Sequence, residues 1–194
     1  RPMRAVGGDL YDFYPIDEKR IGIFIADVSG HGTPAAIISS MLKVVFSLSP
    51  HAAENPAFVL EWMNTSLSGY SHGHFISALY AIVDMEQRLL TVANAGHWPL
   101  LLWRARENSL AEAGKPGRIM GFFPELRISS HTVPLEKGDR LILYTDGILE
   151  QRDQSGHLYG EEGFHAMIRS SGDLTAGEMI EALFMSLSEW SGGE

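Results

Sequence analysis

The stretch Ile21-Gly-Ile-Phe-Ile-Ala-Asp-Val-Ser-Gly-His-Gly-Thr-Pro34 decides how this chain is expected to fold. Residues 21–28 are an apolar run with β-branched and aromatic side chains, preceded by charge and followed by glycine, which predicts a buried strand. Thr33 suits an N-cap and Pro34 a first helical residue, and apolar residues recur at helical spacing after them. The stretch therefore predicts a strand, a glycine turn and a helix, with Asp27 near the end of the strand.

Similar signals predict the other elements. Asn55-Pro56 repeats the cap-and-proline pattern and predicts a second helix that ends near Gly69. Three strands that we interpret as an antiparallel meander are expected at 75–84, 89–95 and 99–104. Two further strands and two helices are expected at 127–134, 139–145, 160–170 and 175–190. The last helix has a capping-box spacing, and its expected buried stripe is Met179, Ile180, Leu183, Phe184 and Leu187.

This grouping of elements predicts the fold class. Strands come in groups and helices in pairs, without strict β-α-β alternation, which favours an α+β layered domain with a largely antiparallel sheet. A chain of 194 residues with 45% hydrophobic composition is long enough for one sizeable core. We therefore expect residues 1–194 to form a single domain.

Composition excludes several classes of function. The chain has no cysteine, which rules out disulfides and thiolate chemistry and favours a reducing, cytoplasmic location. A net charge of -9 argues against a nucleic-acid surface, because phosphate binding needs clustered Lys and Arg. No apolar run approaches the roughly 20 residues of a membrane span, so no membrane association is expected.

Three aspartates stand beside glycines or at the ends of strand-like runs. They are Asp9 in Gly7-Gly-Asp-Leu-Tyr-Asp12, Asp27 in the opening stretch, and Asp146 in Tyr144-Thr-Asp-Gly147. A carboxylate held by a sheet, with glycine beside it, suits a hard cation such as Mg²⁺ or Mn²⁺. Taken one at a time, however, Asp-Gly neighbours are more often turn formers.

Four sequence motifs that occur in order favour a metal site over separate turns. They are Gly7-Gly-Asp-Leu-Tyr-Asp12, Asp27-Val-Ser-Gly-His-Gly32, Asn94-Ala-Gly-His97 and Tyr144-Thr-Asp-Gly-Ile-Leu-Glu150. Together they resemble the SpoIIE/RsbU branch of the metal-dependent PPM-type (phosphatase 2C-like) serine/threonine phosphatases. The resemblance implies a central antiparallel β-sandwich flanked by helix pairs, in α-β-β-α layers, with two Mn²⁺ or Mg²⁺ ions. It also implies a substrate, a phosphoserine or phosphothreonine on a STAS-domain anti-anti-sigma protein.

The same resemblance assigns roles to individual residues. Asp27 looks like the carboxylate that bridges both metals, and the carbonyl of Val28 resembles the backbone ligand beside it. Asp9 is expected to complete one metal and Asp146 the other. Two cations that share a water lower its pKa and hold the phosphoryl group for attack, so these residues act through metal-activated water.

Other candidates keep two interpretations each. Asp12 and Glu150 are expected either to support metal-bound water or to be simple turn or surface residues. His31 and His97 are expected either to donate a proton to the leaving group or to hold their glycine-rich turns by hydrogen bonds. Arg4 is either a contact for substrate phosphate or a solvated surface residue.

The sequence also departs from the family pattern. Family members carry a later Asp-Asp-Ile-Thr-like word whose aspartate supplies another metal ligand, and this sequence reaches Glu194 without it. We therefore expect a domain clipped at both ends, belonging to a longer protein with an upstream sensor or receiver domain and a possible homodimer. The alternative is a catalytically weak or inactive phosphatase fold that sequesters a sigma factor or its antagonist.

Overall fold

The computed structural model describes residues 7–49, 54–71 and 73–193. Its residues cluster into two compact units, which are described separately below. The first unit comprises Arg1–Leu100 and Ala113–Leu135, and the second comprises Leu101–Glu112 and Glu136–Glu194. The expectation of a single domain stays a prediction.

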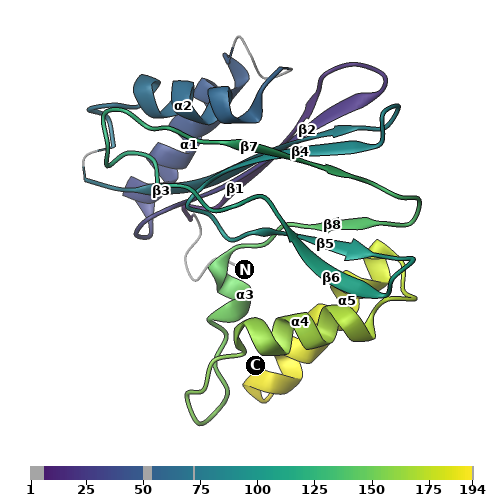
Figure 1. The fold of residues 1–194 in the computed structure, drawn as a ribbon. Coiled ribbons are helices and arrows are strands. Elements are labelled where there is room, and N and C mark those ends of the chain that lie inside the picture. The colour runs from purple at the N-terminus through teal and green to yellow at the C-terminus, as the bar shows by residue number, and fades with distance from the viewer. Residues whose placement is uncertain (1–6, 50–53, 72, 194) are drawn as a thin grey trace. The chain divides into compact units, whose positions relative to one another are not determined.

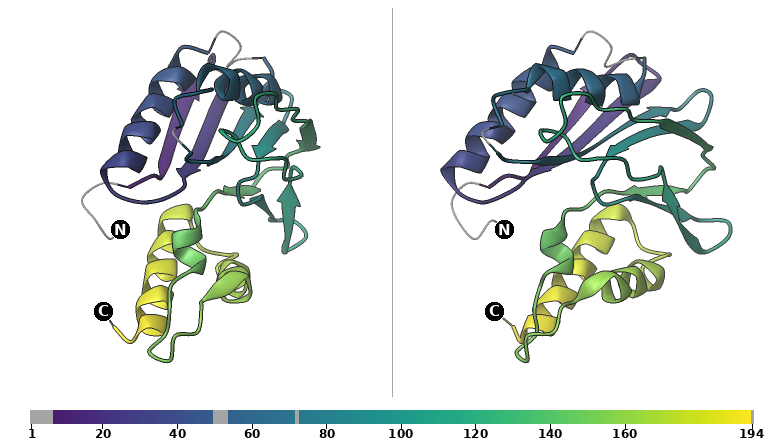
Figure 2. Two further views of the ribbon diagram at one scale, coloured as in Figure 1. Left: turned by 90° about the vertical axis from the view of Figure 1, so that its left-hand side faces the viewer. Right: turned by 60° about the vertical axis from the view of Figure 1, so that its left-hand side comes forward.

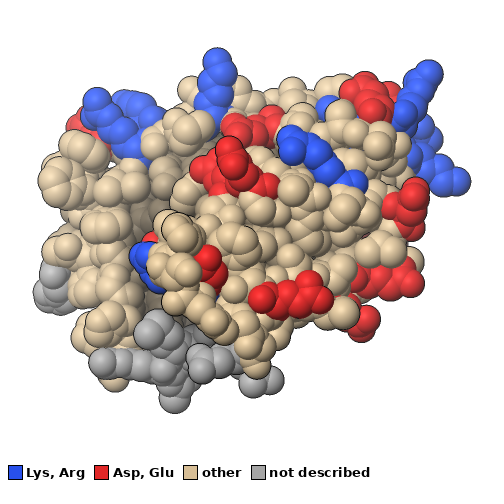
Figure 3. Space-filling model, turned by 90° about the horizontal axis from the view of Figure 1, so that it is seen from below, with Lys and Arg blue, Asp and Glu red and all other residues tan. Residues whose placement is uncertain are grey.

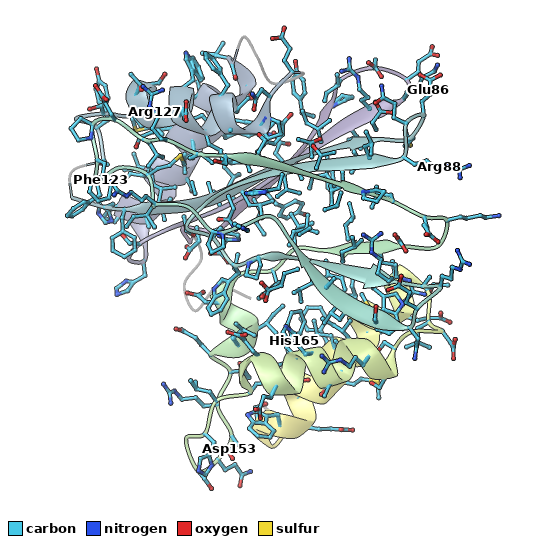
Figure 4. All side chains as sticks on the ribbon, in the orientation of Figure 1. Glu86, Arg88, Phe123, Arg127, Asp153 and His165 are labelled. Carbon is cyan, nitrogen blue, oxygen red and sulfur yellow. The ribbon has the colours of Figure 1, made fainter. Side chains whose placement is uncertain are left out.

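The first unit is built on an antiparallel sheet in the order β1-β2-β3-β4-β7 (Figure 1). Its strands are β1 (Leu10–Pro15), β2 (Arg20–Val28), β3 (Ile76–Asp84), β4 (Leu89–Ala95) and β7 (Ser130–Pro134). The predicted hairpin between β3 and β4 is confirmed, and the Asp84 carboxylate accepts a hydrogen bond from the Gln87 backbone at 2.7 Å. Glu86 and Arg88 mark the tip of this hairpin in Figure 4.

Helices α1 (Thr33–Ser47) and α2 (Pro56–Ser66) cover one face of this sheet (Figures 1 and 2). The core between sheet and helices contains Phe24 stacked on Phe46 at 4.6 Å, with the Tyr80 ring 5.2 Å from Phe46. Burial of these apolar rings is the main force that joins the helices to the sheet. One face of β2 therefore points into this core, and Asp27 lies on the opposite face.

The N-terminal signals of both helices are largely confirmed. Asn55 caps α2, and its side chain accepts hydrogen bonds from the backbone of Ala57 at 3.0 Å and Phe58 at 3.5 Å. The cap of α1 is Gly32 and not Thr33, so that prediction is wrong by one residue. Gly32 has φ 75°, a left-handed conformation that favours glycine over threonine.

The second unit has a three-stranded sheet in the order β6-β5-β8 and three helices. These elements are β5 (Leu100–Arg104), β6 (Ser109–Ala113), β8 (Arg140–Ile142), α3 (Asp146–Leu149), α4 (Gly160–Ser170) and α5 (Ala176–Ser191). The guanidinium of Arg140 donates to the carbonyls of Ser171 and Gly172 at 3.1 and 2.9 Å. It therefore satisfies carbonyl groups just beyond the end of α4 and ties them to β8.

The α+β class is confirmed, because both units combine an antiparallel sheet with helices. The expected meander is wrong at its third strand, since β5 pairs with β6 and β8, while β4 pairs with β7. The turn 94–97 lies between β4 and β5, where the chain changes sheets. Strands β1 and β6 were not predicted, because both are short and lack a long apolar run.

The buried stripe predicted for α5 is also wrong. The capping box of Thr175 and Glu178 is present, but none of the residues of α5 is buried. Ile180 and Phe184 are 53% and 62% exposed. A helical spacing of apolar residues predicts which side chains share a face, but it does not show that another element covers that face.

Two surface properties bear on the excluded functions. Among the described residues, no helix has the length and apolar character needed to cross a bilayer. On the face shown in Figure 3, basic side chains are separated by acidic and uncharged ones, and the described residues there form no continuous basic surface.

Candidate metal centre

Asp9 and Asp27 are placed side by side by the register of the first sheet. Leu10, the first residue of β1, pairs with Ala26 of β2 in antiparallel register. The next step of the same register sets Asp9 beside Asp27. Directly opposed residues in antiparallel strands point to the same face, with β carbons roughly 5 Å apart. Of the three predicted metal ligands, Asp27 therefore lies in β2 and Asp9 directly precedes β1, the strand that pairs with β2.

The carbonyl of Val28 lies in the same place. A β carbon added to Gly8 would come within 2.5 Å of the Val28 oxygen and 3.3 Å of Asp27 Oδ1. Glycine at position 8 therefore allows the backbone to lie close to a carbonyl and a carboxylate oxygen. Carboxylates and a carbonyl are the oxygen donors that Mg²⁺ and Mn²⁺ prefer, so these residues fit such an ion.

The loop after β2 is held from the other side by residues near the start of β3. The Ser29 carbonyl accepts a hydrogen bond from His74 Nδ1 at 2.6 Å, and the Ser29 hydroxyl accepts one from the Phe75 backbone at 3.0 Å. Gly30 packs against the His74 ring, where an added β carbon would lie 3.3 Å away. His31 is exposed in this loop, next to the start of α1.

Ser77 connects the turn 94–97 to the strand residue Asp27. Ser77 pairs with Asp27 across β2 and β3. Its hydroxyl is 2.8 Å from His97 Nδ1, and His97 is only 4% exposed. The Asn94 side chain accepts from the His97 backbone N–H at 2.7 Å and donates to the His97 carbonyl at 3.0 Å. The structure therefore places His97 in a buried, hydrogen-bonded turn.

A long loop, residues 114–129, completes this end of the first unit. Met120 and Ile76 exchange backbone hydrogen bonds of 2.9 and 3.0 Å, so the loop adds to the edge of β3 that faces away from β2 and Val28. Asn64 of α2 anchors the loop, because its side chain accepts from Gly121 N at 2.9 Å and donates to the Phe123 carbonyl at 3.0 Å. Phe123 is labelled in Figure 4.

Asp12 lies on the other face of β1. Its side chain points to the face opposite to that of Asp9. Asp12 pairs with Phe24, whose ring is in the core beneath α1. The Asp12 carboxylate forms an ion pair with Lys43 of α1. Asp12 therefore joins β1 to a helix in this structure, and its expected role in supporting metal-bound water stays a prediction.

Asp146 and Glu150 belong to the second unit. Asp146 is the first residue of α3 and is half-buried, and its carbonyl accepts from the Glu150 backbone at 2.8 Å, which confirms their predicted spacing of one helical turn. Glu150 itself is exposed. Burial and the nearby carboxylates of Glu161 and Glu112 raise the pKa of Tyr144 to about 12. Tyr144 therefore stays neutral and adds no charge near Asp146 at neutral pH.

The three predicted metal-binding aspartates are divided between the two units, with Asp9 and Asp27 in the first and Asp146 in the second. Within the described ranges, no group of three or more His, Cys, Asp or Glu side chains is close enough to hold a metal. A centre that uses all three therefore stays a prediction. Arg4 lies outside the described residues.

The sequence alone did not single out three residues that shape this site. Ser77 is an ordinary strand residue until its register with Asp27 is known, and Asn64 looks like a helix-surface amide although it is only 2% exposed. His74 lies just before β3, and its bond to Ser29 holds the loop after β2. Of these three residues, Asn64 alone had a signal in the sequence, because it is a polar residue within the apolar face of a helix.

Comparison with known proteins identifies the family. The family model described as Stage II sporulation protein E (SpoIIE) matches residues 17–194. The chain is 30% identical over 187 residues to the phosphoserine phosphatase RsbU of Bacillus subtilis (strain 168), covering 96% of this chain and 55% of RsbU. This chain therefore spans about half the length of that relative.

Solved structures show the same fold. The SiaA-PP2C domain of Pseudomonas aeruginosa matches with a TM-score of 0.88 and 25% identity, over 99% of this chain and 77% of that one. A crystal structure of RsbX in complex with magnesium matches with a TM-score of 0.69 and 22% identity, over 98% of this chain and 83% of that one. The resemblance carried by the four sequence words is confirmed. The chain belongs to the SpoIIE family, in the RsbU branch of the PPM-type phosphatases.

Proposed function

We propose that this chain is the catalytic part of a metal-dependent serine/threonine protein phosphatase. The observation that supports the proposal most strongly is that Asp9 directly precedes β1, which pairs with β2, while Gly8 lies close to the Val28 carbonyl and Asp27 Oδ1. Family membership supports it independently. A protein that only bound a partner would have no physical need for this set of oxygen donors.

Each residue has a defined task in this proposal. Asp27 would be shared by two Mn²⁺ or Mg²⁺ ions, with the Val28 carbonyl and Asp9 as further donors to one ion and Asp146 as a donor to the other. Bound metals supply an activated water and neutralise the charge on the phosphoryl group. Asp9 directly precedes β1, Asp27 lies near the end of β2, and Asp146 is the first residue of α3.

The chain also supplies groups around the reacting phosphate. His31 is exposed in the loop before α1, where it is our candidate to protonate the leaving serine oxygen. The loop itself is held by His74 and Phe75 through Ser29, so His31 is carried on an anchored backbone. Loop anchoring matters because proton transfer requires the donor within hydrogen-bond reach of the leaving oxygen.

We further propose that the substrate is a phosphoserine or phosphothreonine on a STAS-domain regulatory protein in the cytoplasm. RsbU is named as a phosphoserine phosphatase, and the RsbX structure contains magnesium, which supports the reaction and the class of metal. We expect the intact protein to carry an upstream sensor or receiver domain and to form a homodimer. These statements follow from family membership and from nothing in the two units alone.

The experiment is phosphate release by the intact protein from p-nitrophenyl phosphate and from a panel of phosphorylated STAS-domain proteins, with Mn²⁺, with Mg²⁺ and with EDTA. We expect turnover that requires the metal and is lost in Asp27→Asn and Asp146→Asn, with circular dichroism as the test of folding. Equal rates for parent and variants would reject the mechanism. Metal-independent binding of a partner without turnover would instead support a sequestering module.

A further inference from the structure

A buried hydrogen-bonded pair, Ser77 and His97, lies directly beside Asp27. Ser77 is the cross-strand neighbour of Asp27, and both side chains point to the same face of the sheet. The distance from Ser77 Oγ to His97 Nδ1 is 2.8 Å. The pair therefore lies across one strand pairing from the carboxylate that our proposed function assigns to both metals.

The His97 ring is fixed by its backbone. The Asn94 side chain, which is fully buried, bonds both the N–H and the carbonyl of His97. Gly96 has φ 73° and packs so closely that a β carbon there would lie 2.4 Å from Ile119. The turn has little freedom, so the ring presents Nδ1 to Ser77 in a defined position.

We propose that Ser77 and His97 are positioning residues that orient the Asp27 carboxylate, an inference that rests on the proposed function. In this arrangement, His97 Nδ1–H donates to Ser77 Oγ, and the Ser77 hydroxyl donates to Asp27. The direction follows from the atoms. A carboxylate only accepts, and a hydroxyl has one hydrogen, so a serine that donates to Asp27 must accept from the imidazole.

The arrangement has a consequence for metal binding. A carboxylate that bridges two ions must hold both oxygens in one orientation, and partners behind metal ligands commonly set that orientation. A hydrogen-bonded chain from imidazole to hydroxyl to carboxylate also strengthens each of its bonds. Loss of the Ser77 hydroxyl therefore weakens metal binding without removing any ligand.

The first measurement is Mn²⁺ affinity of the intact protein by isothermal titration calorimetry. We expect Ser77→Ala to weaken binding roughly tenfold to a hundredfold, and Ser77→Thr, which keeps the hydroxyl, to bind like the parent. Thr91→Val is the matched control, because the Thr91 hydroxyl bonds Thr132 at 3.1 Å across another strand pair of the same sheet. We expect this control to leave Mn²⁺ affinity unchanged.

The second measurement concerns the histidine and needs no metal. Nitrogen-15 NMR of the metal-free protein is expected to show His97 protonated at Nδ1. His97→Asn, whose amide nitrogen can donate from a similar position, is expected to retain more Mn²⁺ affinity than His97→Ala. Thermal unfolding of every variant separates weaker metal binding from a smaller folded fraction.

The outcomes distinguish this inference from the proposed function. If the parent binds Mn²⁺ and Ser77→Ala binds it equally well, the positioning role is wrong while the phosphatase proposal stands. An unprotonated Nδ1 on His97 also overturns the role, because the hydroxyl must then donate to the ring. If the parent itself binds no Mn²⁺, the proposed function fails and this inference fails with it.

Discussion

Gly8 lies against the carbonyl oxygen of Val28, and a β carbon at position 8 would approach that oxygen to 2.5 Å. We predict that Gly8→Ala leaves the chain folded and lowers its Mn²⁺ affinity roughly tenfold or more, because the methyl group occupies space in front of two proposed ligand atoms. Calorimetric titration with Mn²⁺ measures this. Gly147→Ala is the control, since Gly147 adjoins Asp146 and has nothing within 4 Å of an added β carbon. Equal losses in both variants would contradict the prediction.

Gly22 predicts a second effect, on stability alone. A β carbon there would lie 2.2 Å from the Tyr80 hydroxyl and 2.8 Å from its ring, and Tyr80 is fully buried. We predict that Gly22→Ala destabilises the protein by about 1–3 kcal/mol, the usual cost of overpacking a core. Urea denaturation measures the change. Gly177→Ala, at an open position of α5, is expected to be neutral or slightly stabilising, and a parent-like Gly22→Ala would show that the core adjusts freely.

The Asn64 side chain is expected to hold the loop 114–129 in place. Replacing Asn64 with alanine removes its hydrogen bonds to Gly121 and Phe123 and leaves those buried groups without their partner. We expect a loss of about 1–3 kcal/mol in stability, together with faster proteolysis within the loop. Limited proteolysis with mass spectrometry locates the cleavage. Thr65→Ala is the neighbouring control, because the Thr65 hydroxyl donates to the Glu61 carbonyl of its own helix at 3.1 Å. Unchanged cleavage of the loop in Asn64→Ala would reject the anchor.

The Glu178 carboxylate is expected to make the stability of the protein depend on pH. Its pKa is lowered by hydrogen bonds from the Thr175 backbone first and the Thr175 hydroxyl second. A lowered folded-state pKa means that the carboxylate stabilises the protein above the ordinary glutamate value of 4.5, and that this contribution is lost as pH falls through the folded value. We therefore expect the stability difference between parent and Glu178→Gln to be constant near neutral pH and to shrink in acid. Denaturation curves from pH 7 down to about pH 3 test this. A difference that grows in acid would contradict it.

Much of the fold was predictable because local signals and tertiary packing agree. Residues 21–28 are apolar and β-branched, and they occupy β2 at the centre of a sheet. The caps at Asn55 and Thr175 begin helices as expected. The pairing of β4 with β7 was not predictable in the same way, because those strands are separated by residues 96–129 and only their packing brings them together.

Candidate ligands could be proposed from the sequence, and they stay a prediction, whereas the residues around them could not be proposed in the same way. Sequence words located Asp9, Asp27 and Asp146, because their neighbours are specific to a family. Ser77 carries no such signal, since its importance depends on the antiparallel register with Asp27. Helix α5 shows an error of the opposite kind. The periodicity of its apolar residues predicted that Phe184 is buried, whereas Phe184 is exposed in the structure.

The bridging role of Asp27 is the central claim, and counting bound Mn²⁺ tests it most directly. Electron paramagnetic resonance of the intact protein, titrated with Mn²⁺, distinguishes a coupled pair of ions from isolated ones. Our account predicts two coupled ions per chain for the parent and loss of the coupled pair in Asp27→Asn, with the fold retained by circular dichroism. A parent that never binds a coupled pair, or an Asp27→Asn variant that binds one as tightly as the parent, would contradict it.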